Sequence, residues 1–190
     1  MPRVAVVGDS ISAGSPLWDP DPAVRARIAV PDERSQWQWW AAQADPSLEF
    51  RTSAVYGERT DQIALRLHMV LGGADVLVVQ GGINDIAQQR PVEDAGRNLE
   101  AMVERGRDAG LAVAVPDVLP WPAGDERAAS EIARLNELIC AITGAIDGVT
   151  HLPFHDTLAS AGFDWSDDGD HPSVEGYRLL GECAAPLLSG

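Results

Sequence analysis

Five short apolar runs, separated by longer segments with helical spacing, constrain the fold of this chain more than any other feature. The runs are rich in β-branched residues and occupy 4–8, 48–55, 75–81, 111–119 and 149–154. Between them, apolar residues recur at three- and four-residue intervals over 35–45, 60–72, 91–110, 126–146 and 172–188. Continuous apolar runs are typical of strands buried on both faces of a parallel sheet. The alternation therefore predicts a three-layer α/β/α fold, in which helices flank a sheet of about five parallel strands.

The length of the chain predicts a single domain over residues 1–190. A chain of 190 residues lies in the range that one hydrophobic core serves. Its 45% hydrophobic content suits a folded chain, and no low-complexity stretch divides it.

The charge of the chain disfavours two classes of partner. Fourteen basic residues against 29 acidic ones give a formal net charge of -15, and such a field repels nucleic acid and anionic membrane surfaces. No window reaches the 18 or so apolar residues of a membrane span. We expect no nucleic-acid partner and no stable membrane association. The N-terminal residues lack the pattern of a signal peptide, so a cytoplasmic location is the default expectation, and a secreted protein whose leader was removed remains an alternative.

The first apolar run ends in Gly8, Asp9 and Ser10. By itself, this tripeptide has the composition of an ordinary turn. A serine between a strand and a helix is also where α/β hydrolases carry their nucleophile. The choice between these interpretations depends on which partners the fold brings to the same edge of the sheet.

Three further segments supply such partners. Gly57 and Asn84 each follow a predicted strand. The backbone N–H of Gly57 and the side-chain amide of Asn84 can therefore meet at the carboxyl edge of the sheet, as donors to an oxyanion. Asp168 and His171 stand three residues apart before the last helix, a spacing that lets the carboxylate orient the imidazole. Together with Ser10 they predict a Ser-His-Asp hydrolase site.

These segments resemble a known family. The GDSL-type esterases of the SGNH hydrolase superfamily carry similar blocks in the same order, here Gly8-Asp9-Ser10, Gly57, Gly82-Ile83-Asn84-Asp85 and Asp168-Gly169-Asp170-His171. The resemblance extends from the first predicted strand to the last helix. It implies a flavodoxin-like sheet and an esterase that works through an acyl-serine intermediate, without a metal or other cofactor.

The resemblance also implies a role for each residue. Ser10 would be the nucleophile, His171 the general base and Asp168 the residue that orients it. The backbone N–H groups of Ser10 and Gly57 and the side-chain amide of Asn84 would form the oxyanion hole. One departure is visible: the family often has asparagine five residues before this glycine, where this chain has Thr52.

Four residues are candidates for contact with the substrate. Asp9 precedes the nucleophile, and Trp18, Trp121 and Trp165 lie in loops expected on the catalytic edge. The tryptophans either pack these loops onto the body or line the cleft. In the second case their flat faces suit a sugar ring or an aromatic group.

The expected substrate is therefore a small-molecule ester, either small or carbohydrate-linked. A lysophospholipase, a thioesterase or an acyltransferase of the same superfamily is the alternative. A non-catalytic module that binds carbohydrate or nucleotide is a third interpretation, disfavoured because a binder has little need of an aligned nucleophile and base.

The cysteines and the remaining histidines predict no metal site. Cys140 and Cys183 lie among apolar neighbours without a CxxC partner, and free thiols are expected rather than a disulfide. His151 and His155 could join Asp156 at a metal, but Pro153 breaks the local geometry and no further ligand is apparent.

Overall fold

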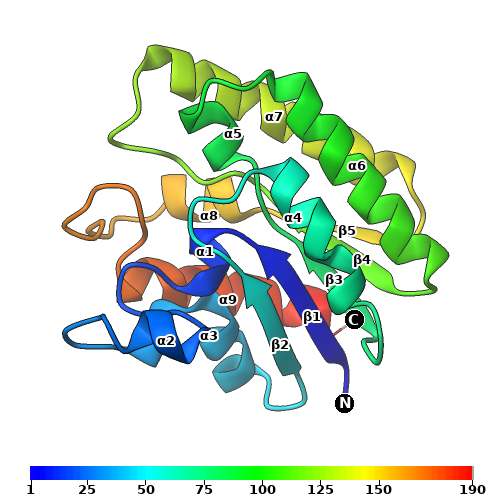
Figure 1. The fold of residues 1–190 in the computed structure, drawn as a ribbon, viewed down its shortest axis with the longest axis horizontal. Helices are drawn as coiled ribbons and strands as arrows, with labels where there is room; N and C mark the ends of the chain where they lie inside the picture. Colours follow the sequence, from blue (N-terminus) through cyan, green and yellow to red (C-terminus); the bar gives the residue numbers. More distant parts are fainter. Residues whose placement is uncertain (190) are drawn as a thin grey trace.

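The computed structural model describes residues 1–189 and contains a five-stranded parallel sheet (Figure 1). The strand order is β2-β1-β3-β4-β5, with β1 at Arg3–Gly8, β2 at Glu49–Ala54, β3 at Val76–Val79, β4 at Ala112–Pro116 and β5 at Val149–Leu152. Every pairing is parallel. The predicted α/β fold is confirmed.

Helices occupy the segments between the strands. The five predicted helices correspond to α3 (Trp37–Ala44), α4 (Thr60–Arg66), α6 (Val92–Asp108), α7 (Glu126–Ala145) and α9 (Val174–Leu188). Four short helices were not predicted, namely α1 (Ser10–Ala13), α2 (Pro22–Arg25), α5 (Ile83–Ala87) and α8 (Phe154–Ala159). With four to six residues each, they are too short to show a helical period. Two of them, α1 and α5, begin at the predicted site.

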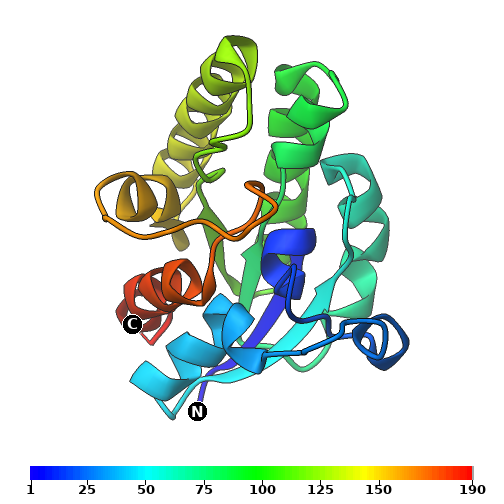
Figure 2. The same cartoon turned by 90° about the vertical axis from the view of Figure 1, so that its left-hand side faces the viewer.

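Each face of the sheet has its own apolar core. Helices α4 to α7 cover one face, whereas α3, α8 and α9 cover the other (Figures 1 and 2). Along β1, Ala5 and Val7 enter the first core, while Val4 and Val6 enter the second. Successive side chains of a strand point to opposite faces, so a strand covered on both sides must be apolar throughout. This explains the uninterrupted run at residues 4–8.

The strand order places two predicted site segments side by side. The chain passes from β1 to β2 at one edge and then returns to β3 on the other side of β1. Open parallel sheets bind their ligands at such a reversal, beyond the carboxyl ends of the strands. Ser10 follows β1 and Asn84 follows β3, so both lie at this position.

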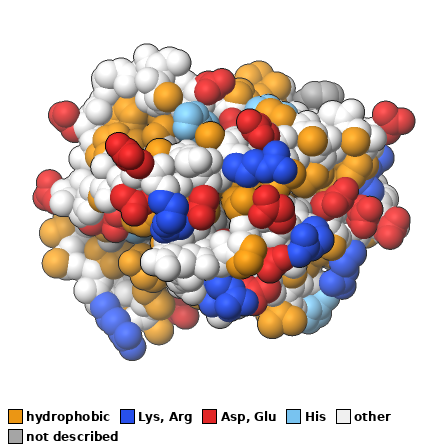
Figure 3. Space-filling model, turned by 90° about the horizontal axis from the view of Figure 1, so that it is seen from above, with side chains coloured by type: hydrophobic (Ala, Val, Ile, Leu, Met, Phe, Trp, Pro, Cys, Tyr) orange, Lys and Arg blue, Asp and Glu red, His pale blue; other side chains and the backbone are white. Residues whose placement is uncertain are grey.

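The surface matches a chain that carries many charges of both signs. On the face shown in Figure 3, acidic and basic side chains are interspersed. Among residues 1–189, no helix combines the length and the apolar character needed to cross a membrane.

Candidate active site

A sharp turn at the end of β1 positions Ser10. Asp9 is the N-cap of α1: its Oδ1 accepts hydrogen bonds from the backbone N–H of Ile11 (3.0 Å) and from Gln80 Nε2 (2.9 Å). A Cβ on Gly8 would lie 2.5 Å from Gln80 Oε1, so the turn requires glycine here. Ser10 then becomes the first residue of α1 and is 5% exposed.

The loop before α9 brings His171 to Ser10. Figure 2 shows this loop, in orange, beside α1 in blue. His171 Nε2 lies 2.9 Å from Ser10 Oγ, and His171 Nδ1 lies 2.7 Å from Asp168 Oδ2. An ionised carboxylate only accepts hydrogen bonds, so Nδ1 carries the proton and Nε2 is left to accept the hydroxyl proton of Ser10.

Asp168 is fixed by four donors. Its Oδ1 accepts hydrogen bonds from Ser166 Oγ (2.7 Å) and from the backbone N–H groups of Asp170 (2.9 Å) and His171 (3.0 Å), while Oδ2 faces the imidazole. Partial burial by itself would raise the pKa of Asp168. The hydrogen bonds outweigh this effect and lower the pKa to about 2. Asp168 is therefore a carboxylate at neutral pH.

The predicted oxyanion donors gather at the ends of β2 and β3. Gly57 has φ of +78°, and its backbone N–H has no acceptor within hydrogen-bonding distance among residues 1–189. Asn84 lies in the first turn of α5, and its Nδ2 donates to the Glu58 carbonyl at 3.0 Å. An amide nitrogen has two hydrogens, so one remains for a ligand.

Arg66 ties the ends of β1 and β2 to the turn that follows β2. Its guanidinium donates to the carbonyls of Gly8 (3.1 Å) and Ser53 (2.9 Å), and its Nε lies 2.9 Å from a carboxylate oxygen of Glu58. The sequence offered no signal for this role, because arginines on exposed helix faces are common. Arg66 braces the turn that carries Gly57.

The atypical Thr52 is also accounted for. Its hydroxyl accepts a hydrogen bond of 3.3 Å from Gln38 Nε2, which also donates to the Ser12 carbonyl at 2.7 Å. Gln38 of α3 thus links β2 to α1 through the residue that stands where the family often has asparagine.

The four candidate substrate contacts have different surroundings. Trp121 donates from Nε1 to Asp170 Oδ1 (2.6 Å), and Trp165 packs on Phe163 with ring centroids 5.2 Å apart. Both flank the His171 loop.

The Arg25 guanidinium lies 4.4 Å from the centroid of the half-buried Trp18 ring, and contact of Trp18 with a substrate stays a prediction. The expectation that Asp9 contacts the substrate is wrong. Asp9 is completely buried, and its carboxylate is the N-cap of α1. Tyr56, which sequence reasoning missed, is 65% exposed and its ring centroid lies 5.9 Å from that of His171. No motif distinguishes it from a loop residue.

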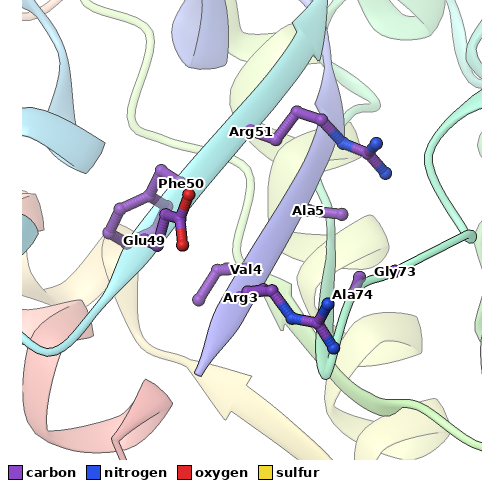
Figure 4. Close-up of a pocket in the computed structure, with 8 residues that line it drawn as sticks. All are labelled: Arg3, Val4, Ala5, Glu49, Phe50, Arg51, Gly73 and Ala74. Atoms are coloured by element: carbon purple, nitrogen blue, oxygen red, sulfur yellow. The ribbon is translucent and has the colours of Figure 1, made fainter. Parts of the chain in front are cut away.

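Two hollows flank the His171 loop. A small pocket of about 20 Å³ lies between Ile11, Gly81, Trp121 and Asp170, and an open groove of about 830 Å³ lies along Pro16, Trp165, Asp168 and Val174. A third cavity, of about 180 Å³, lies at the amino ends of β1 and β2, the opposite edge of the sheet (Figure 4). It contains none of the predicted site residues.

The burial of Asp9 leads to a prediction on stability. Burial raises the pKa of Asp9 to about 6, against the hydrogen bonds from Ile11 and Gln80, and Asp9 Oδ2 has no hydrogen-bond partner among residues 1–189. Between about pH 4 and 6 the folded state therefore binds more protons than the unfolded one, so the stability that Asp9 contributes falls as the pH rises through this window. The loss is about 2 to 3 kcal/mol. We expect Asp9→Asn to remove this slope in urea unfolding between pH 4.5 and 7.5.

The control for this experiment is Asp147→Asn, at an exposed aspartate. This variant should keep the slope of the parent chain. An Asp9→Asn protein whose unfolding free energy keeps the full slope would show that Asp9 is already ionised in this window.

Comparison with known proteins places the chain in a family. Residues 6–179 match the model of the GDSL-like lipase/acylhydrolase family, whereas a comparison with curated proteins found no match. A member of the lipolytic G-D-S-L family from Veillonella parvula superposes with a TM-score of 0.80 at 18% identity, covering 98% of both chains. A lipase/acylhydrolase from Enterococcus faecalis superposes with a TM-score of 0.79 at 19% identity, covering 98% of this chain and 94% of that one. The psychrotrophic esterase EstA from a Pseudoalteromonas species superposes with a TM-score of 0.74 at 16% identity, covering 100% of this chain and 97% of that one.

At these identities the structural likeness establishes the fold, and the family match extends over most of the sequence. The chain belongs to the GDSL-like lipase/acylhydrolase family of hydrolases.

Proposed function

We propose that this protein hydrolyses carboxylic esters with a short acyl group through an acyl intermediate on Ser10. The observation that carries the proposal is the contact between His171 Nε2 and Ser10 Oγ, at 2.9 Å, with Nδ1 of the same ring held by Asp168. A serine hydroxyl is a weak nucleophile until a base accepts its proton.

The reaction then follows in two halves. Ser10 Oγ attacks the ester carbonyl carbon while its proton passes to His171 Nε2, and the oxyanion accepts hydrogen bonds from Ser10 N, Gly57 N and Asn84 Nδ2. The intermediate collapses, the alcohol leaves with the proton of His171, and the acyl group stays on Ser10. Water attacks this ester with His171 again as base, which releases the acid and restores the serine.

The two hollows support the choice of substrate. The pocket between Ile11 and Asp170 is formed by the chain neighbours of Ser10 and His171, and its volume suits a group of about methyl size. The groove along Trp165 and Asp168 is much larger and contains aromatic surface. We assign the acyl group to the pocket and the alcohol, a sugar or another ring, to the groove.

Two measurements test the proposal. Hydrolysis of p-nitrophenyl esters should be fastest for acetate and fall with acyl length, and a fluorophosphonate should form one adduct, located by peptide mass spectrometry at Ser10. The EstA structure is described as inhibited by monoethylphosphonate, a related group. An adduct elsewhere would overturn the mechanism.

A preference for long acyl chains or acyl-CoA would favour the lysophospholipase or thioesterase alternative. Transfer of the acyl group to an added alcohol, without release of acid, would favour an acyltransferase.

Removal of one oxyanion donor should slow the chemistry without unfolding the chain. We expect Asn84→Ala to lower kcat on p-nitrophenyl acetate by about 100- to 1000-fold with little change in KM, because the oxyanion exists only in the transition state. Gln89→Ala, on the exposed turn after α5, is the matched control and should retain activity. A comparable loss in both variants would mean that the turn, rather than the amide, matters.

A further inference from the structure

A second cluster of reactive side chains lies outside the Ser10 site. Asp117 directly follows β4, His151 is in β5 and Cys140 is in α7, which packs against both strands (Figure 1). One ligand atom from each residue lies within 4.8 Å of those of the other two. We propose that these three side chains bind a thiophilic divalent cation of the zinc type.

The geometry favours a metal site over a second catalytic triad. Asp117 Oδ1 lies 2.6 Å and Cys140 Sγ 4.0 Å from the same ring nitrogen, His151 Nε2. A nucleophile, base and orienting acid would use the two opposite nitrogens of the imidazole, as Ser10, His171 and Asp168 do. Here the carboxylate oxygen, the thiol sulfur and one ring nitrogen face a common point, as the ligand atoms around a cation do.

The two distances to His151 Nε2 require only small adjustments. Tetrahedral zinc with bonds of about 2.0 to 2.3 Å separates a sulfur and a nitrogen ligand by about 3.6 Å, and a nitrogen and an oxygen ligand by about 3.3 Å. The Cys140–His151 distance would shorten by a few tenths of an ångström and the His151–Asp117 distance would lengthen somewhat more. Register already fixes two ligands, since His151 pairs with Val115 on β4, two residues before Asp117.

The chemistry of the three groups selects the cation. One thiolate, one imidazole and one carboxylate are the ligand types of zinc, whereas magnesium and calcium prefer oxygen alone. On binding, the Cys140 S–H bond breaks and its proton passes to the buffer, so sulfur coordinates as thiolate. His151 coordinates through the lone pair of Nε2, with its ring proton on Nδ1. Cys140 is exposed and His151 is half-buried, which leaves the fourth position to water.

The local field also attracts a cation. The carboxylates of Asp117 and Asp156 both act on Cys140 through their negative charge. A negative field of this kind favours a divalent cation.

Cobalt reports directly on thiolate ligation. The full chain, treated with chelator and a phosphine reductant and then freed of both, is titrated with Co²⁺ alone. The expected result is an intense near-ultraviolet charge-transfer band that saturates at one equivalent and is abolished by one equivalent of Zn²⁺. Competition with a chromogenic chelator then gives the Zn²⁺ affinity.

Variants distinguish metal binding at this site from nonspecific metal binding. Cys140→Ser, at an exposed position, should abolish the cobalt band and weaken Zn²⁺ binding at least about tenfold, and His151→Gln should weaken it similarly. Cys183→Ser is the matched control, because Cys183 is a free thiol in α9 whose sulfur accepts a hydrogen bond from Thr157 instead. It should leave both signals unchanged. Absence of the band, or a band that survives Cys140→Ser, would overturn the proposal.

Discussion

Replacement of Ser10 by alanine is expected to lower kcat for p-nitrophenyl acetate by on the order of 10⁵- to 10⁶-fold. The variant loses the atom that forms the acyl bond, whereas the oxyanion donors and both hollows remain. Binding should change little, so KM should stay within a few-fold of that of the parent chain. Initial rates with purified protein, together with loss of fluorophosphonate labelling, provide the measurement.

Two controls accompany Ser10→Ala: an unrelated serine variant, and a double variant that tests whether Ser10 and His171 act together. Ser160→Ala, at an exposed position after α8, should match the parent chain. Because Ser10 and His171 act as one unit, the double variant Ser10→Ala/His171→Ala should be no slower than Ser10→Ala alone. Additive losses, or labelling that survives Ser10→Ala, would contradict the assignment of the nucleophile.

Replacement of Asp168 by asparagine is expected to lower kcat by about 10⁴-fold at neutral pH. An asparagine Oδ1 can still accept the hydrogen bonds from Ser166, Asp170 and the His171 backbone, so the loop should keep its shape. The amide nitrogen, however, would face His171 Nδ1 as a donor and select the wrong ring tautomer. Steady-state kinetics on p-nitrophenyl acetate measures the loss.

Two observations distinguish the loss of the orienting carboxylate from a general disturbance of the loop. Asp167→Asn, at the exposed neighbouring position, should retain activity. Since the folded pKa of Asp168 is about 2, below the value for an unfolded carboxyl, its contribution to stability is present above about pH 4 and is lost as the pH falls toward 2. Asp168→Asn should lack this acid-side loss. Full activity of Asp168→Asn at neutral pH would refute the orienting role.

The fold was predictable from the sequence because the strongest signals are long-range and repetitive. A strand such as β1 must be apolar on both sides when helices cover both faces, and this leaves an unmistakable run. The ends of the elements were less accessible. The apolar run at 111–119 continues beyond β4, which ends at Pro116, because Val118 and Leu119 are buried in a loop and not in the sheet.

The candidate site was predictable only in part. The segments around Ser10, Asn84 and His171 carry motif spacing, and the structure brings these residues to one edge of the sheet. Asp9 was misjudged because its position next to Ser10 does not reveal its burial, whereas in the fold its carboxylate is enclosed and bonded to Ile11 and Gln80. Asp117, Cys140 and His151 share no motif, so only the pairing of β4 with β5 and the packing of α7 bring them together.

The contact between Ser10 and His171 joins residues 161 positions apart. During synthesis, Ser10 leaves the ribosome with the first strand, while His171 follows only when nearly the whole chain has been made. Under the proposed mechanism, a nascent or truncated chain that lacks α9 and the loop before it would carry a serine hydroxyl without a general base. Hydrolytic activity would then be a late event, and its recovery during refolding would report the docking of these two distant segments rather than the formation of the sheet.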